Sequence, residues 1–436
     1  MSLLSRPLVS RPLFAALAVA FSCSAWAAKP VKAAPPPAKV AEPTSVELAH
    51  NLGEASEGRL QAVVDRYNRE NNGKIKLVRL ERDEKLAPLN LVTRYDLSEL
   101  LARGKQVMPL HEAMAKGGKP LKLDLSPELK STVSDGKGRL VALPLVYSTP
   151  VLFYNKNALR KAKLDPERPP QTWFEMQVML DKLQDAGFAC PYTSTWPVWV
   201  HIDNMSAVSG LPAVSDRGEL AFNGLPQVKH IAMMTTWVQA SFFKIYGRRN
   251  EASQHFHNGE CAMITTNSRE AVDFADAKGV DLGVAPLPYH DDVYGGRQPT
   301  LADGAALWVG AGHTPGEYKE AAKFVSFLLS PQMQTEVVKE YGGLPMTSEA
   351  RAAVRSSLLK DASTKALDVA YASLKSGSGK PAVRVSSIDP LRIIANDELE
   401  AIWNQGKPAK AALDTSVSRG NAVLGAKPWL KKAQPF

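Results

Sequence analysis

Cysteine and long apolar runs are both scarce in this sequence. Three cysteines among 436 residues exclude a disulfide-rich scaffold and a cysteine-rich zinc fold. The one strongly apolar segment, residues 13–21, is far shorter than the roughly 20 residues that a membrane-spanning helix needs. A polytopic membrane protein is therefore excluded. Hydrophobic residues make up 44% and charged residues 22% of the chain, which excludes collagen, coiled coil and wholesale disorder.

Motifs for catalysis are also missing. Residues 377–380 read Gly-Ser-Gly-Lys, but Pro381 stands where a Walker motif needs a hydroxyl residue. No Gly-x-Ser-x-Gly or His-Glu-x-x-His pattern occurs. His255 and His257 are predicted to lie in a polar turn, with a pair of metal ligands on one strand face as the alternative. The sequence therefore predicts a protein that is not an enzyme and carries no metal or cofactor. A secreted hydrolase is a competing hypothesis without a supporting motif.

Positive charge is present in excess. The formal net charge is +9, which favours an anionic partner. The basic residues are dispersed along the chain, and neither an aromatic RNA-binding motif nor a helix-turn-helix pattern accompanies them. We therefore expect a small anion, and no nucleic acid, as the partner.

The N-terminus has the pattern of a secretory signal peptide. Two arginines precede the short apolar segment, and an Ala-Trp-Ala sequence at 25–27 fits a cleavage site. We predict that residues 1–27 are removed on export to the periplasm. Residues 28–44, with five prolines and five alanines, are predicted to form an extended tether. The alternatives are a buried N-terminal helix and a lipoprotein anchored through Cys23.

The rest of the chain predicts alternating strands and helices. A strand at 45–50, a helix with apolar residues at helical spacing from Leu60 to Tyr67, and a strand at 75–80 make a parallel α/β unit. Further strands are predicted at 141–144, 151–154, 190–194 and 262–266, and helices at 97–104, 173–186, 227–240, 315–329, 397–404 and 409–424. This order predicts two interleaved α/β lobes, the first from 45–149 and 307–345, the second from 150–306 and 346–436.

Candidate ligand residues stand where predicted strands end, and α/β sheets bind ligands there. Ser148 offers a hydroxyl, and Ser268 is predicted to open a helix whose free N–H groups suit an anion. Gly304 permits close approach of a ligand to the backbone. Trp196 and Trp199 suit the wall of a cleft for a sugar or polyol; the alternative is that both are core aromatics.

Arg392 and the two later cysteines leave alternatives open. The guanidinium of Arg392 is suited to bidentate recognition of phosphate, and a surface salt bridge to Asp389 or Asp397 is the alternative. Cys190 and Cys261 are the only cysteines beyond the signal peptide. They either form a disulfide in an oxidising compartment or remain two buried thiols.

Several segments resemble the family-1 extracellular solute-binding proteins, which are the substrate-capture subunits of ABC importers. The resemblance rests on residues 153–156, 164–166, 170–173, 256–263 and 398–403. It narrows to the periplasmic members that bind sn-glycerol-3-phosphate through residues 148–152, 196–199, 227–233, 246–249, 304–309 and 413–421.

The resemblance implies a two-lobed periplasmic binding protein of the type II kind, with the ligand in a cleft between the lobes. The ligand would be sn-glycerol-3-phosphate or a glycerophosphodiester, captured by hinge closure about residues 147–151 and 302–309. The implied ligand residues are Ser148, Trp199, Ser268, Gly304 and Arg392, with Trp196 as a wall. The implied partners of this monomeric subunit are an ABC permease and its ATPase.

The first lobe departs from that pattern. A Gly-x-Tyr segment expected after the second strand has no clear counterpart, and Thr93 and Arg94 occupy the place of an expected glutamate. The aromatic position of an expected Tyr-Leu-Pro segment falls on Gly343, with Tyr341 two residues earlier. Arg94 and Tyr341 are therefore added as candidate ligand residues. Lost polar partners change which ligand fits, so a sugar, a polyol or another small anion is the alternative ligand. A scaffold or sensor that no longer closes is an alternative function.

Overall fold

The computed structural model describes residues 45–80, 85–93, 106–121, 125, 127–130, 132–134, 137–293, 296–357, 362–374 and 385–427. The predicted signal peptide and tether, the predicted helix at 97–104 and the candidate Arg94 lie outside the described residues. Among the residues that are described, no helix is both long enough and apolar enough to cross a bilayer.

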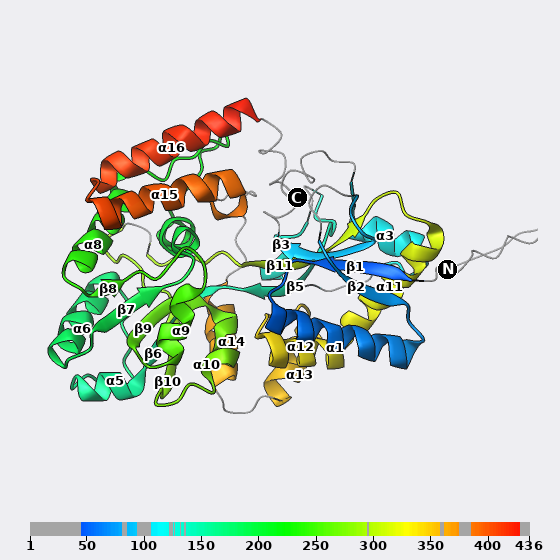
Figure 1. The fold of residues 1–436 in the computed structure, drawn as a ribbon, viewed down its shortest axis with the longest axis horizontal. Helices are drawn as coiled ribbons and strands as arrows, with labels where there is room; N and C mark the ends of the chain where they lie inside the picture. The colour runs from blue at the N-terminus through cyan, green and yellow to red at the C-terminus, as the bar shows by residue number, and fades with distance from the viewer. Residues whose placement is uncertain are drawn as a thin grey trace, which may run out of the picture. The chain divides into compact units, whose positions relative to one another are not determined.

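The first lobe is built on a six-stranded sheet in the order β2-β1-β3-β11-β4, with β5 also paired to β11 (Figure 1). Its strands are β1 (Val46–His50), β2 (Ile75–Arg79), β3 (Leu89–Thr93), β4 (Val107–Met108), β5 (Leu143–Ser148) and β11 (Asp303–Gly310). β1 is parallel to β2 and β3, as the strand–helix–strand order predicts, whereas β11 is antiparallel to β3, β4 and β5. A strand from late in the chain thus completes a sheet begun at the N-terminal end.

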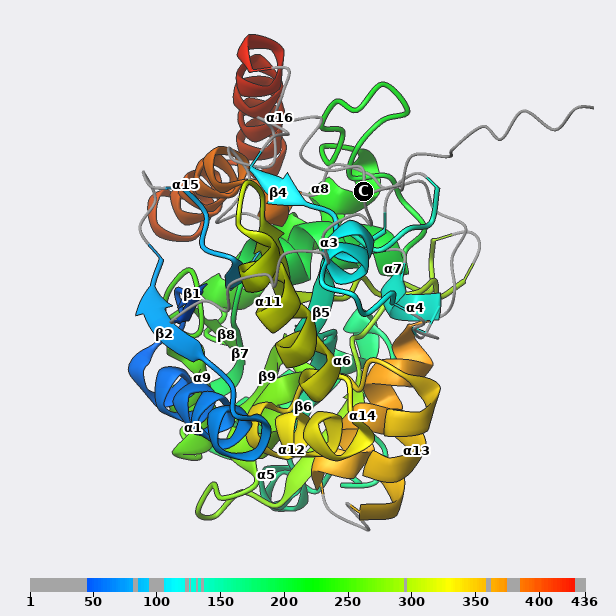
Figure 2. The ribbon, with the colours of Figure 1, turned by 90° about the vertical axis from the view of Figure 1, so that its right-hand side faces the viewer.

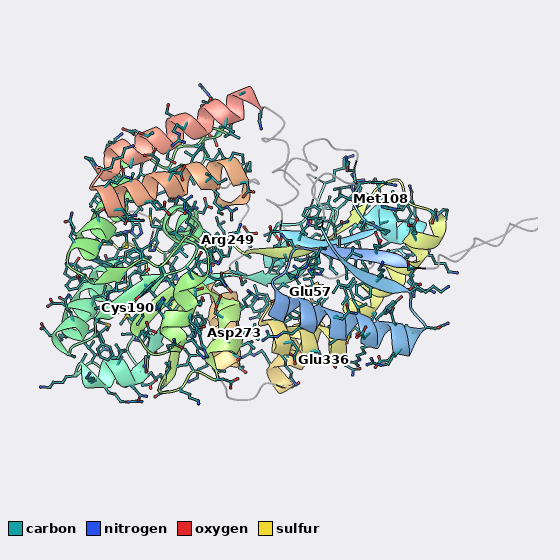
Figure 3. The ribbon with its side chains drawn as sticks, in the orientation of Figure 1. Glu57, Met108, Cys190, Arg249, Asp273 and Glu336 are labelled. Carbon is teal, nitrogen blue, oxygen red and sulfur yellow. A yellow bond between two sulfur atoms is a disulfide. The ribbon has the colours of Figure 1, made fainter. Side chains whose placement is uncertain are left out.

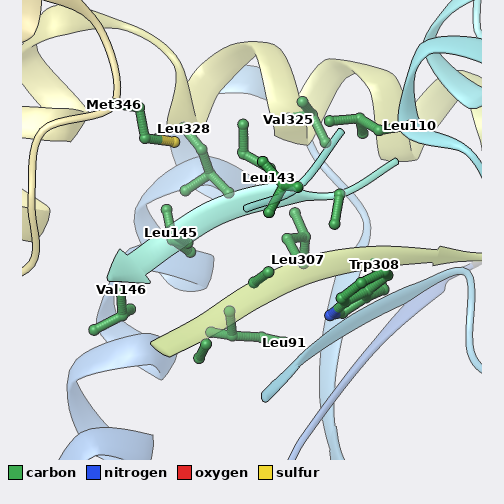
Figure 4. Packing of buried hydrophobic residues seen from close by; sticks show 14 of the residues in the cluster. Leu91, Leu110, Leu143, Leu145, Val146, Leu307, Trp308, Val325, Leu328 and Met346 are labelled. Carbon is green, nitrogen blue, oxygen red and sulfur yellow. The ribbon is translucent and has the colours of Figure 1, made fainter. Parts of the chain in front are cut away.

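Helices cover this sheet with apolar faces. They are α1 (Glu54–Asn71), α3 (Leu110–Lys116), α4 (Pro127–Lys130), α11 (Pro315–Leu328), α12 (Pro331–Tyr341) and α13 (Ser348–Ser357). Figure 2 shows α11 between α3 and α12, both of which it contacts. Leu143 and Leu145 of β5 and Leu307 of β11 share one buried cluster with Val325 and Leu328 of α11 (Figure 4).

The second lobe has a five-stranded sheet in the order β10-β6-β9-β7-β8. Its strands are β6 (Pro150–Asn155), β7 (Cys190–Ser194), β8 (Phe243–Lys244), β9 (Cys261–Asn267) and β10 (Leu282–Pro286). β6 is antiparallel to β9 and β10, and β7 is parallel to β8 and β9. The register places Cys190 (Figure 3) opposite Cys261, and a disulfide joins them. The structure thus contains the disulfide and not the two separate thiols.

Nine α-helices surround the second sheet in the part of the chain that is described. They are α5 (Lys156–Lys161), α6 (Trp173–Asp185), α7 (Met205–Val208), α8 (Leu225–Gln239), α9 (Glu251–His257), α10 (Ala271–Phe274), α14 (Ala362–Ser373), α15 (Asp389–Gln405) and α16 (Ala409–Ala426). A π-helix at Trp199–Asn204 and 3-10 helices at Ser268–Glu270 and Val385–Ser387 complete the set. Thr172 and Glu175 form a reciprocal capping box at the start of α6, which confirms the predicted helix start.

Both faces of the second sheet are buried. Along β6, Leu152 and Tyr154 belong to one apolar cluster, and Val151 and Phe153 belong to another. Successive side chains of a strand point to opposite faces, so helices cover this sheet on two sides. The sequence therefore shows a continuous apolar run at 151–154 and no alternation with polar residues.

A single residue separates the two sheets at one point. β5 of the first sheet ends at Ser148, β6 of the second begins at Pro150, and only Thr149 lies between them. Pro150 is tolerated because the first residue of a strand need not donate to the ladder. A proline also favours an extended residue before it, which keeps Thr149 in line with both strands.

One sequence prediction about local structure was wrong, and another gave a helix that is too short. His255 and His257 lie in the last turn of α9, not in a polar turn or a strand. Their intervening residue, Phe256, is fully buried, and its packing favours the helix. The helix predicted at 397–404 begins at Asp389, because Pro390 fits the first turn, where the missing N–H has no helical partner.

Candidate ligand-binding site

Ser148 and Ser268 lie at the crossover between the sheets. The Ser268 N–H donates to the carbonyl oxygen of Thr149 at 2.8 Å, and the Thr149 N–H donates to Oγ of Ser268 at 3.3 Å. Ser148 is 4% and Ser268 is 3% exposed. The end of β5, the start of β6 and the end of β9 therefore meet at one point, and this juxtaposition brings together two of the residues predicted from sequence.

Gly304 lies beside the same crossover, for a reason that differs from the predicted one. It pairs with Tyr147 in the β5–β11 ladder, and a Cβ atom at Gly304 would lie 2.1 Å from the Val146 carbonyl oxygen. Real Cβ atoms do not approach so closely, so the neighbouring strand alone requires glycine here. The close approach that we predicted for a ligand is made by backbone, and a ligand contact at Gly304 remains a prediction.

The residues that follow Tyr341 lie beside the crossover between the sheets. Gly342 has a φ of +66°, and a Cβ atom there would lie 2.3 Å from the Arg269 carbonyl oxygen. Leu344 N–H donates to the Tyr147 carbonyl oxygen at 2.8 Å. The Tyr341 hydroxyl itself donates to the Ser56 carbonyl oxygen at 3.3 Å, and burial raises its pKa above the ordinary value. The turn after α12 thus borders the crossover, while the phenol packs against α1.

The two tryptophans differ in exposure. Trp196 is half-buried and has a φ of +48°, an unfavourable conformation for a large side chain. Its backbone N–H donates to the Arg249 carbonyl oxygen at 2.9 Å, and the Arg249 guanidinium lies 5.9 Å from its ring centroid. Trp199 is only 7% exposed and begins the π-helix. π-helical turns occur frequently at functional sites, and this one places Trp199 a turn beyond the end of β7.

Arg392 lies on the first turns of α15, largely buried. Its side chain is 11% exposed, and Nη2 donates to Oδ1 of Asp389. The second carboxylate considered from sequence, Asp397, pairs instead with Arg248 at 3.0 Å. The alternative salt bridge to Asp389 is therefore present, although it is largely buried and not at the surface, and contact with a phosphate remains a prediction.

Four buried polar atoms near these residues have no hydrogen-bond partner among the described residues. They are Oγ1 of Thr149, Oδ1 of Asn267, Nε1 of Trp199 and Oγ of Ser386. An unsatisfied buried polar group costs roughly 1–3 kcal/mol, and native proteins contain few of them. Thr149 and Asn267 directly adjoin Ser148 and Ser268 in the chain, and unpartnered buried atoms of this kind are typical of a place where a polar ligand or water completes the hydrogen bonding.

A buried acid lies two residues after Ser268, in the same 3-10 helix. Glu270 is 5% exposed, and Nδ2 of Asn267 donates to its Oε1 at 3.1 Å. Burial raises the pKa of Glu270 above its ordinary value, although Arg269 and the Asn267 hydrogen bond oppose the shift. The second lobe thus carries an acid at its part of the site, whereas the sequence comparison predicted the loss of one from the first lobe.

Comparison with known proteins identifies the family. The sequence profile of the bacterial extracellular solute-binding proteins matches residues 62–365. The chain belongs to this family. As a member, it is a solute-binding component of an ABC importer, and such components have no enzymatic activity.

The most similar relatives include sn-glycerol-3-phosphate-binding periplasmic proteins. The UgpB protein of Salmonella typhimurium is 35% identical over 334 residues, which cover 73% of this chain and 76% of UgpB. UgpB of Escherichia coli is 34% identical over the same length. Among solved structures, UgpB from Mycobacterium tuberculosis in complex with glycerophosphocholine has a TM-score of 0.73 at 18% identity, covering 88% of this chain and 99% of that one.

Sugar-binding members have the same fold. Maltose-bound MalE3 of T. maritima has a TM-score of 0.69 at 17% identity and covers 87% of this chain and 100% of that chain. These likenesses confirm the predicted two-lobed α/β fold of the solute-binding family.

Sequence reasoning missed several residues of the site. Thr149 lies within the motif at 148–152 and Asn267 precedes Ser268, but neither is singled out by the sequence, because a threonine or asparagine at a strand end is common. Asp203 and Ser386 gave no local signal. Asp203 accepts hydrogen bonds from the N–H groups of Val385 and Ser386, and this contact is visible only when the fold brings them together.

Proposed function

We propose that this chain captures sn-glycerol-3-phosphate or a glycerophosphodiester in the periplasm and delivers it to an ABC permease with its ATPase. The observation that carries the proposal is the 35% identity, over 73% of the chain, to an sn-glycerol-3-phosphate-binding periplasmic protein. A signal peptide at residues 1–27 would direct export. Anchoring through Cys23 is the alternative, and we propose a monomer.

The second lobe supplies the groups that a phosphorylated glycerol needs. Arg392 would hold the phosphate, because a guanidinium matches two phosphate oxygens in one plane. Its contact with Asp389 orients the guanidinium. Ser148 and Ser268 would donate hydroxyls, and Trp196 with Trp199 would cover the glycerol carbons. Arg94 would add positive charge from the first lobe.

Capture would proceed by hinge closure without covalent chemistry. Thr149 joins the two sheets directly, so small changes in its backbone angles would reorient one lobe against the other. Arg59 of α1 and Asp273 of α10 form an ion pair at 3.6 Å across the two lobes. Both side chains are more than a third exposed, so this contact is weak enough to break and re-form.

A sugar or polyol is the second candidate ligand. It is favoured by the sugar-binding proteins among the structural neighbours, such as maltose-bound MalE3. It is also favoured by the exposed part of Trp196, since aromatic faces suit the C–H surfaces of sugars.

Isothermal titration calorimetry with the exported, mature protein tests the proposal. The titrants are sn-glycerol-3-phosphate, glycerophosphocholine, inorganic phosphate and maltose. We expect binding of at least one phosphorylated glycerol and none of maltose. Absence of heat with every phosphorylated glycerol would overturn the ligand proposal and leave the family unchanged.

The variant Arg392→Ala separates the two ligand classes. A phosphate ligand should lose most of its affinity, and a neutral sugar should lose much less. Arg248→Ala is the matched control, because Arg248 is also an arginine that contacts α15, through Asp397 and Glu400. We expect the control to bind like the unmodified protein. An equal loss of affinity in both variants would mean that binding depends on the packing of α15 and not on the charge of Arg392.

A further inference from the structure

Asp203 joins two segments of the second lobe that are far apart in the sequence. Its carboxylate accepts the N–H of Val385 at 3.1 Å and the N–H of Ser386 at 2.9 Å, across 182 and 183 residues of sequence. Asp203 is 1% exposed. A carboxylate is buried at high cost unless hydrogen bonds compensate it, and bonds to an ionised acceptor are stronger than neutral ones. The contact therefore fixes the 3-10 helix Val385–Ser387 firmly against the π-helix.

The elements that Asp203 joins carry two candidate ligand residues. Trp199 lies four residues before Asp203 on the same π-helix. Beyond the 3-10 helix, Ile388 is the N-cap of α15, and its carbonyl oxygen accepts the N–H of Arg392 at 2.9 Å. The position of Arg392 relative to Trp199 therefore depends on how the start of α15 is held.

We propose that Asp203 is a positioning residue for ligand binding, which sets the Arg392 guanidinium at the place where the ligand anion is held. This inference rests on the proposed function. Asp389 holds the guanidinium from its own helix, and Asp203 holds the backbone from which that helix starts. Asp389 thus fixes the orientation of the guanidinium, and Asp203 fixes the position of the helix that carries it.

Two further atoms distinguish this contact from an ordinary structural one. Nε1 of Trp199 and Oγ of Ser386 are buried and have no partner among the described residues. One belongs to the π-helix of Asp203, and the other belongs to the residue whose N–H Asp203 accepts. Interior hydrogen-bond networks are normally completed. One unpartnered buried atom on each of the two elements that Asp203 joins is expected where a ligand completes the hydrogen bonding.

The variant Asp203→Asn tests the inference in the mature protein. An asparagine keeps the shape but offers one acceptor oxygen in place of two, so one of the two backbone N–H groups loses its partner. We expect affinity for the phosphorylated glycerol that the unmodified protein binds to fall about 10- to 100-fold, the range typical of residues that orient a ligating group. The matched control is Glu398→Gln. Glu398 is also a buried carboxylate that holds α15, through Lys407 and Arg419, but it lies away from Arg392. We expect the control to keep its affinity.

A double-mutant cycle shows whether Asp203 acts through Arg392. Asp203→Asn and Arg392→Lys should be non-additive: once Arg392 is replaced, the change at Asp203 should cost little further affinity. Additive losses, or unchanged affinity in Asp203→Asn, would overturn the inference. An equal loss in Glu398→Gln would do so as well.

Hydrogen exchange separates this inference from the proposed function. Amide exchange at Val385 and Ser386 should accelerate in Asp203→Asn and stay unchanged in Glu398→Gln, whether or not a ligand is known. If the unmodified protein binds no phosphorylated glycerol, the proposed function fails and the exchange result still decides whether Asp203 holds the start of α15. Unchanged exchange in Asp203→Asn would overturn the positioning role by itself.

Discussion

His201 and His230 face each other inside the second lobe, with 3.1 Å between Nδ1 of His201 and Nε2 of His230. The pair is the middle of a column of hydrogen-bonding side chains. The Tyr192 hydroxyl lies 3.2 Å from Nε2 of His201, and Nδ1 of His230 lies 3.0 Å from Nε2 of His290. Neutral imidazoles link in this way because each ring has one donor and one acceptor nitrogen. Protonation of a ring removes its acceptor nitrogen, so a neighbour that donated to that nitrogen must change its tautomer.

The column predicts that the protein loses stability in mild acid. Burial lowers the pKa of His201 to about 3, and it lowers the pKa of His230 and His290 from 6.5. Below pH 6.5 the unfolded chain binds protons that the folded chain does not bind. The free energy of unfolding should therefore decrease as the pH is lowered below 6.5. The decrease is about 1.4 kcal/mol per pH unit for each histidine that stays neutral in the folded protein. Urea unfolding between about pH 7.5 and about pH 4.5 measures the slope.

A variant of the column should reduce that slope. In His230→Gln we expect the slope to shrink by about one proton; His257→Gln, on α9 outside the column, is the control for the loss of an imidazole. Equal slopes in all three proteins would show that other groups govern the acid sensitivity.

The disulfide predicts a large loss of stability on reduction. Cys190 and Cys261 are 71 residues apart in sequence, and removal of a native disulfide typically costs 2–5 kcal/mol, that is roughly 4 kcal/mol for a loop of this length. We expect the double variant Cys190→Ala, Cys261→Ala to unfold at a lower urea concentration than the oxidised protein. Its unfolding midpoint should not change when a reductant is added. Ligand affinity should persist, because the disulfide joins the starts of β7 and β9 and the site lies at their ends. A double variant as stable as the oxidised protein would contradict this.

Glu270 should make the free energy of unfolding decrease as the pH rises, whereas the histidines make it decrease as the pH falls. Its folded pKa is raised by burial, so the folded state prefers the protonated acid, and its favourable contribution is lost as the pH rises from about 4.5 through the raised folded value. Glu270→Gln should therefore stabilise the protein at neutral pH, by roughly 1–3 kcal/mol, since the amide can still accept the hydrogen bond from Asn267. The measurement is thermal unfolding of both proteins at neutral pH. A destabilised variant would mean that the carboxylate is ionised and satisfied by Arg269.

Two glycines allow steric contact to be separated from backbone strain. Gly342 and Gly406 have φ of +66° and +68°, but a Cβ atom would lie 2.3 Å from the Arg269 carbonyl oxygen at the first and in open space at the second. Gly406→Ala should cost about 1–2 kcal/mol for its left-handed conformation. Gly342→Ala should cost more in thermal unfolding, and it should weaken binding because Arg269 follows Ser268. Equal losses of stability in the two variants would show that the Arg269 backbone can move away from the added Cβ atom at no cost.

Local features of the fold were predictable from sequence. The Thr172–Glu175 spacing fixes the start of α6, and the apolar residues from Leu60 to Tyr67 fix the buried face of α1, because both signals lie within a few residues. The strand ends that carry Ser148 and Ser268 followed from the same kind of pattern. Their meeting was not predictable from parallel α/β order, because β5 and β9 belong to different sheets and β6 runs antiparallel to β9.

The remaining parts of the site depend on contacts that no local pattern encodes. The π-helix at Trp199–Asn204 breaks the helical period, so its residues looked irregular. His201, His230 and His290 are scattered in sequence and meet only in three dimensions. The Asp203–Ser386 hydrogen bond joins segments 183 residues apart. Whether Cys190 and Cys261 pair also required the strand register.

The one-residue crossover at Thr149 limits the lengths of chain that this fold can accept. An inserted residue there would shift β6 by one position, and a shift by one turns every side chain of a strand to the opposite face. Val151 and Phe153 would then face the cluster that now holds Leu152 and Tyr154, and the reverse. Because helices cover both faces, neither cluster would fit its new residues. Homologous chains should therefore vary in loop length almost anywhere else before they vary at this point.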